Sequence, residues 1–103
     1  MHSLQEQAYA IANEMKARSY CYNFTIFEFQ VPGEREKSLR ISVYKVDDSM
    51  VDKVESDIYD ISFDLEKRGY PGRVLVSVYR PEESNRMLEQ DSDFKAVYYY
   101  VGA

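Results

Sequence analysis

The longest helical pattern in the chain runs from Asp48 to Gly69. Its apolar side chains recur at spacings of three and four residues, which places them in one stripe along a helix. Asp48 or Ser49 is expected to cap the first turn, and Gly69 to end the helix in a left-handed conformation. We therefore predict a central helix that turns one stripe toward the core: Val51, Val54, Ile58, Ile61 and Leu65.

A shorter helical pattern precedes it near the N-terminus. Ser3 and Glu6 have the spacing of a capping box, in which each side chain satisfies a free backbone N–H of the other residue. The helix is expected to end near Arg18 or Ser19, and its apolar face is expected to carry Leu4, Ala8, Ile11 and Met15.

Two strands are predicted between the helices, joined as a hairpin through the turn that Pro32 and Gly33 open. The first, Tyr20 to Val31, is aromatic and β-branched, and its alternation changes phase near Ile26. A β-bulge there would place both apolar sets on one face. Alternatively, the strand is buried on both sides over its middle or is covered by a partner chain. The second strand, Leu39 to Val46, alternates regularly.

Two further strands are predicted after the central helix, at Arg73 to Arg80 and at Phe94 to Val101. Pro81 is expected to stop the first of them. The polar segment between them, Glu82 to Asp93, is expected to be a loop or one to two turns of helix bearing Met87 and Leu88.

The element order predicts one α+β domain over residues 1–103, with the sequence α-β-β-α-β-β. We expect a four-stranded antiparallel sheet in the order first, second, fourth, third, with both helices on one face. This is a circularly permuted ferredoxin-like arrangement. In element order alone, the chain is also similar to the open sheets of some KH-type and secretion-ring domains.

Charge is distributed very unevenly along the 103 residues, whose net charge is −5. Residues 47–66 hold eight acids and one base, and residues 82–93 hold five acids and one base. The two segments together therefore carry −11 and the remainder +6. The negative balance disfavours general affinity for nucleic acid, because such binding depends on neutralising phosphates.

The acidic side of the central helix is the first candidate site. Three carboxylates lie opposite the apolar stripe, where they could meet a basic partner protein or form a solvated face: Asp57, Asp60 and Asp64. A metal site is not expected, because a divalent cation needs more converging oxygens. The acids of the second segment are predicted to join the same partner-binding surface: Glu82, Glu83, Glu89 and Asp91.

The sheet face away from the helices is the second candidate site, because ten tyrosines is a high number for this length. Tyrosines combine apolar area with a polar tip and favour interfaces. We expect this face to be open and to bind through aromatic and basic side chains: Arg40, Tyr44, Arg73, Tyr79 and Tyr99.

The sequence offers little for catalysis. His2 and Cys21 are the single histidine and cysteine, and a pair between them would require the N-terminus to fold back. The glycine-rich phosphate-binding motifs are missing. We expect no enzyme activity, no cofactor and no metal, and the absence of long apolar runs predicts a cytoplasmic protein without membrane contact.

These features lead to the hypothesis of a small acidic protein-binding module. In size and charge it resembles inhibitors and immunity proteins, including some phage-encoded anti-CRISPR proteins, that occlude a basic nucleic-acid-binding surface. The alternative is a homo-oligomeric structural subunit that associates through its open tyrosine-rich face or an edge strand. Binding of single-stranded nucleic acid by stacking on tyrosines is a weaker third hypothesis.

Overall fold

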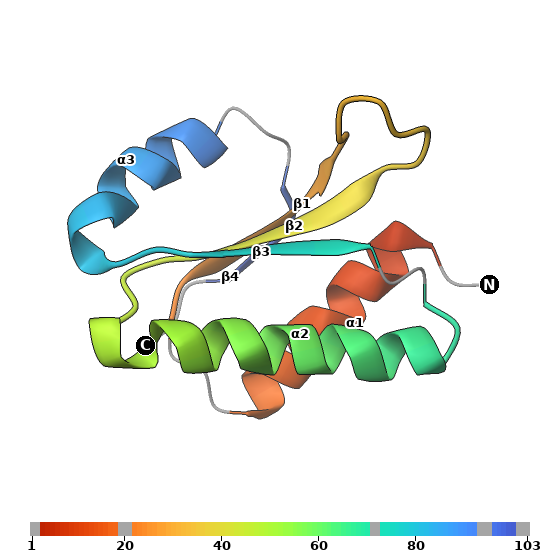
Figure 1. The fold of residues 1–103 in the computed structure, drawn as a ribbon, viewed down its shortest axis with the longest axis horizontal. Helices are drawn as coiled ribbons and strands as arrows, with labels where there is room; N and C mark the ends of the chain where they lie inside the picture. The colour runs from red at the N-terminus through yellow and green to blue at the C-terminus, as the bar shows by residue number, and fades with distance from the viewer. Residues whose placement is uncertain (1–2, 19–21, 71–72, 93–95, 101–103) are drawn as a thin grey trace.

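The computed structural model describes residues 3–18, 22–70, 73–92 and 96–100. Within these residues the chain forms helices and strands in the order α1, β1, β2, a 3₁₀ turn, α2, β3, α3 and β4 (Figure 1). Their bounds are α1 Leu4–Ala17, β1 Phe24–Phe29, β2 Ser38–Val43, η1 Asp48–Met50, α2 Val51–Lys67, β3 Val74–Val78, α3 Pro81–Asp91 and β4 Ala96–Tyr100. The predicted boundaries at residues 19–21, 71–72, 93–95 and 101 fall outside the described residues.

The predicted α+β class, the four-stranded sheet and the placement of two helices, α1 and α2, on one face are confirmed (Figure 1). The sheet, however, is mixed. β1 pairs antiparallel with β2 and β4, but β2 pairs parallel with β3, and the strand order is β3-β2-β1-β4. The prediction of an all-antiparallel sheet with the order first, second, fourth, third is therefore wrong.

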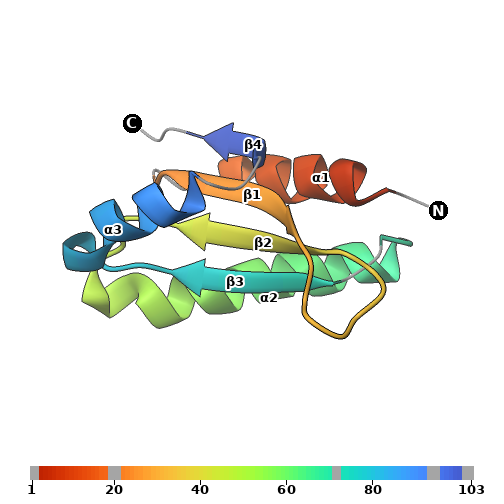
Figure 2. The ribbon, with the colours of Figure 1, turned by 90° about the horizontal axis from the view of Figure 1, so that it is seen from above.

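The parallel pair has a direct physical cause. α2 carries the chain back along the sheet, so that β3 begins at the same end as β2 and runs in the same direction (Figure 2). β3 lies directly beside β2, whereas the permuted ferredoxin-like order would place the last strand next to β2. The last strand, β4, pairs with β1 at the other border of the sheet.

The core lies between the sheet and the pair of helices α1 and α2. The whole predicted stripe of α2 is buried in it, together with Ala8, Ile11, Ala12 and Met15 of α1. Phe24 and Ile26 of β1 and Leu39, Ile41 and Val43 of β2 supply the sheet side. The helical periodicity therefore identified the core correctly.

Three of the four predicted helix ends are confirmed. α1 ends at Ala17 with Arg18 as its C-cap, as expected. Ser3 Oγ accepts a hydrogen bond from the Glu6 N–H at 3.1 Å, which completes the capping box of α1. Gly69 follows α2 with φ 93°, and its N–H donates to the Glu66 carbonyl. The prediction that Asp48 or Ser49 caps α2 is wrong. A 3₁₀ turn leads into α2 instead, and no side chain caps it.

β1 is buried on both faces over its middle. Its pairing with β2 is regular from Phe24 to Phe29, and the register shift between Ile26 and Phe27 occurs only against β4. Phe24 and Ile26 therefore face the helices, while Thr25 and Phe27, both buried, face the other way. The hypothesis that a bulge gathers both apolar sets on one face is wrong, and the alternative of a strand buried on both sides is confirmed.

α3 is an eleven-residue helix where the sequence suggested a loop or at most two turns. Pro81 occupies its first turn, and the Arg80 N–H donates to the Glu83 carboxylate at 2.9 Å. Ser84 Oγ accepts from the Lys45 N–H at 2.7 Å, which fixes α3 to the segment after β2. Pro81 thus ends the β3 segment and also begins a helix.

Ile58 tests the core directly, because it lies at the centre of the α2 stripe and is 0% exposed. We expect Ile58→Ala to lower the free energy of unfolding by about 2–5 kcal/mol, since it leaves a cavity that the rigid sheet cannot fill. Ser56→Ala, on the exposed side of the same helix, is the control and should change it by less than about 0.5 kcal/mol. Equal losses in urea unfolding would contradict this packing.

Candidate functional site

The outer side of α2 carries most of the exposed negative charge of the described helices. Asp52, Glu55, Asp60, Asp64 and Glu66 are exposed on it. Asp57, partly buried, pairs with Lys53 at 3.4 Å. No ion pair involves the five exposed acids within the described part of the chain. Asp60 and Asp64 of the predicted site therefore lie where a partner can reach them.

Phe63 stands out on this acidic surface, because 61% of it is exposed. It lies three residues after Asp60, so these two side chains are close neighbours on the helix, and Asp64 follows Asp60 by four residues on the adjoining side. The Lys67 ammonium lies 5.0 Å from the centre of its ring. The site prediction omitted Phe63, although its position off the apolar stripe was visible in the sequence.

The four predicted acids of α3 divide into two kinds. Glu82 and Glu89 are exposed. Glu83 holds the start of α3 through the Arg80 N–H, and Asp91 is only 6% exposed. The Asp91 carboxylate accepts a hydrogen bond from the Tyr44 hydroxyl at 2.6 Å. Asp91 is thus part of the folded interior and is not an exposed acid of a binding surface.

The second predicted site is not an open tyrosine face. Tyr44 is 1% and Tyr79 is 9% exposed, and their rings stack with centres 5.9 Å apart. Burial raises the pKa of the Tyr44 hydroxyl well above its ordinary value, and the hydrogen bond to Asp91 adds to this. The expectation of exposure is wrong because α3, which was not foreseen at its full length, contacts this face through Asp91.

Arg40 lies at the centre of the same face. Its Nη2 donates to Ser77 Oγ at 3.3 Å and to the Tyr79 hydroxyl at 3.1 Å. Its guanidinium carbon lies 6.0 Å from the ring centre of Phe27 and 5.7 Å from that of Phe29. Arg40 and Tyr79 are therefore brought together as predicted, but they form a half-buried structural cluster.

The remaining two residues of that predicted face do not join the cluster. Arg73 donates to Glu34 at 2.7 Å and lies 3.4 Å from Glu36, so its charge is matched by the turn between β1 and β2. Tyr99 belongs to β4, and its side chain lies outside the described residues. The described side chains of this face therefore form no row of exposed tyrosine rings on which bases could stack.

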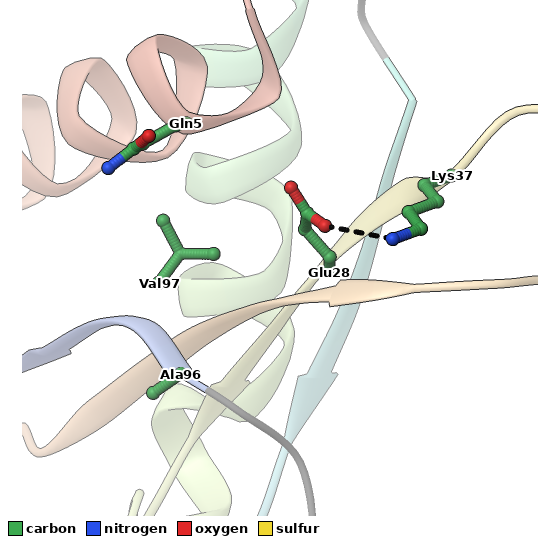
Figure 3. A pocket seen from close by; sticks show the side chains of 5 residues that line it. All are labelled: Gln5, Glu28, Lys37, Ala96 and Val97. Carbon is green, nitrogen blue, oxygen red and sulfur yellow. Dashed lines mark hydrogen bonds and ion pairs between the residues drawn. The ribbon is translucent and has the colours of Figure 1, made fainter.

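A pocket of about 460 Å³ opens near the start of α1, beside β1 and β4. Figure 3 shows the Glu28 carboxylate and the Lys37 ammonium pairing on one side of it, with Gln5, Ala96 and Val97 around the space. The ion pair spans 3.4 Å and is well exposed. No signal in the sequence pointed to this pocket, because its residues come from four separate segments.

The described residues show neither a metal-binding cluster nor a membrane-spanning helix. Among them, no group of three or more His, Cys, Asp or Glu side chains is arranged to hold a metal ion. No described helix has the length and apolar character needed to cross a bilayer. His2 and Cys21 lie outside the described residues.

The chain matches no protein-family model, no curated protein sequence and no solved structure.

The hydrogen bond between Tyr44 and Asp91 can be tested by removing one oxygen. We expect Tyr44→Phe to lower the free energy of unfolding by about 1–3 kcal/mol, because it leaves a buried carboxylate without its donor. Tyr9→Phe removes a hydroxyl from a residue that is 43% exposed and should cost less than about 0.5 kcal/mol. Urea unfolding at neutral pH measures both.

Tyr44→Phe should also change how the free energy of unfolding depends on pH in alkaline solution. The pKa of Tyr44 is raised in the folded state above its ordinary value of about 10. The unfolded chain therefore releases this proton first, and stability falls as pH rises above about 10. The stability difference between the wild type and Tyr44→Phe should shrink there by up to about 1.4 kcal/mol per pH unit. A constant difference up to pH about 11 would contradict the raised pKa.

Proposed function

We propose that this protein is a binding module that engages a basic partner protein through the outer side of α2. The observation that carries the proposal is Phe63, an exposed aromatic ring set among exposed carboxylates. Interfaces commonly combine an aromatic anchor with charges that steer the partner.

The charge balance of α2 supports a partner of opposite sign. Its residues include six acids and two bases, and one of the bases, Lys53, is engaged by Asp57. Attraction by such a surface raises the rate of encounter with a basic protein and decreases with added salt. The exposed Glu82 and Glu89 of α3 extend the negative charge of the molecule beyond α2.

A basic partner surface of this kind is typical of proteins that bind nucleic acid. Carboxylates placed where phosphates would lie compete with the nucleic acid for the same lysines and arginines. The proposal therefore includes an inhibitory or immunity-type role, in which the module occludes that surface. It assigns no reaction and no cofactor to the chain.

Asp60→Asn combined with Asp64→Asn tests the proposal, because it removes two exposed charges next to Phe63 without touching the core. We expect a tagged wild-type protein to capture a basic protein from the native host's lysate at low salt and to release it at high salt. The double variant should associate with that protein about tenfold more slowly at low salt.

The matched control is Asn13→Lys combined with Gln90→Lys. It shifts the net charge by the same amount at two exposed positions outside α2. Its association rate should stay much closer to that of the wild type. If both variants slow equally, only net charge matters and the α2 surface is not the binding site. Capture of the chain by itself alone would favour the homo-oligomer instead.

A further inference from the structure

β3 borders the described sheet, and only β2 pairs with it (Figure 2). Its residues Val74–Val78 contain no charged residue and no proline. Natural edge strands usually carry such residues, because a bare edge is a template for another strand. β3 lacks that protection over its whole length.

The backbone groups on this edge are placed for a further strand. The Leu39 N–H donates to the Arg73 carbonyl at 2.9 Å, and the Tyr79 N–H donates to the Val43 carbonyl at 2.8 Å. Since strand residues alternate in direction, the backbone groups of Val76 and of the neighbouring valines point away from β2. The Val76 N–H confirms this, because it donates to the Tyr59 hydroxyl of α2 at 3.3 Å.

A second feature of α2 lies along the same edge. Tyr59 is part of a row whose spacing keeps it on one side of the helix, and all its members are exposed. The row presents apolar rings between carboxylates, beside the outward backbone groups of β3, one of which Tyr59 itself engages: Asp52, Glu55, Tyr59, Phe63 and Glu66. None of the three acids forms an ion pair with a described residue.

The two arginines that flank β3 do not offset these acids, because other carboxylates already pair with them. Arg73 precedes β3 and pairs with Glu34 and Glu36. Arg80 follows β3 and pairs with Asp48. Lys67, whose ammonium lies 5.0 Å from the centre of the Phe63 ring, offsets one of the three acids of the row. The border of β3 is therefore uncharged on the strand and, on balance, negative on the helix.

We propose that the β3 edge docks an extended strand rich in lysine or arginine from the partner protein. Main-chain hydrogen bonds to β3 would provide the pairing, and the acids of α2 would select basic side chains on the docked strand. A second copy of this chain is a poorer occupant, since it would bring two sets of these acids together. The inference rests on the proposed function only for the sign of the partner's charge.

A capped peptide of alternating lysine and valine, seven residues long, is the probe. We expect it at low salt to slow hydrogen exchange of the Val76 and Val78 amides at least about tenfold, because Val78 gains a backbone partner and Val76 exchanges the exposed Tyr59 hydroxyl for one. A peptide with glutamate in place of lysine should leave both rates unchanged. If exchange of these amides instead becomes slower as the protein concentration rises, in the absence of peptide, β3 pairs with a second copy of the chain and the proposal is overturned.

Val76→Pro removes the outward N–H while sparing the bonds to β2. We expect peptide affinity to fall at least about tenfold. Should this variant fail to fold, Glu55→Lys with Glu66→Lys gives the second test on exposed positions. It should weaken the lysine peptide about tenfold and admit the glutamate peptide. Unchanged affinity in folded Val76→Pro would overturn strand addition, and unchanged affinity in the folded double variant would overturn selection of a basic strand by the acids of α2.

These outcomes are separate from those of the lysate experiment. If Val76→Pro is folded and still captures the basic protein at the wild-type rate, strand addition fails and the proposed function stands. If the wild type captures no basic protein but the lysine peptide protects Val76 and Val78, the docking edge stands and the proposed function fails.

Discussion

The burial of one stripe of α2 is the constraint on which the rest of this structure depends. α2 must turn Val54, Ile58 and Leu65 into the core, and it does so beneath the parallel pair of β2 and β3. The opposite side of the helix is then left to solvent, where carboxylates keep their hydration. The position of the acids, the course of β3 and the free edge of the sheet all follow from this packing.

The other face of the sheet shows how a short helix can change the role of predicted site residues. Tyr44 and Tyr79 would be natural interface residues if they were exposed. α3 supplies Asp91 as the partner of Tyr44, and Arg40 bonds to Tyr79, so both hydroxyls are used within the fold. Tyr44 and Tyr79 thus stabilise the packing on this face of the sheet. The exposed acids of α2 become the stronger candidate for a binding site.

Periodicity and end signals were sufficient to predict α1, α2, the core stripe and the four strands, because these depend on neighbours in sequence. The parallel pairing of β2 with β3 depends on the end of the sheet to which α2 returns the chain. The residues Val74–Val78 contain no local signal that predicts this direction. α3 was underestimated because only Met87 and Leu88 are apolar, although Pro81 and Glu83 already had the spacing of a helix start. The exposure of Asp60 and Asp64 was predictable from the helical spacing, whereas the burial of Asp91 required the fold.

The central claim is that α2, and not the Arg40 face, is the functional surface. The most direct measurement is an NMR comparison of hydrogen exchange and chemical shifts between the chain alone and the chain in complex with the basic protein captured from lysate. The account predicts that protection appears at the amides of the β3 edge and that chemical-shift changes of the complex centre on Asp60, Phe63 and Asp64. Changes centred instead on Arg40, Phe29 and Leu75 would contradict it.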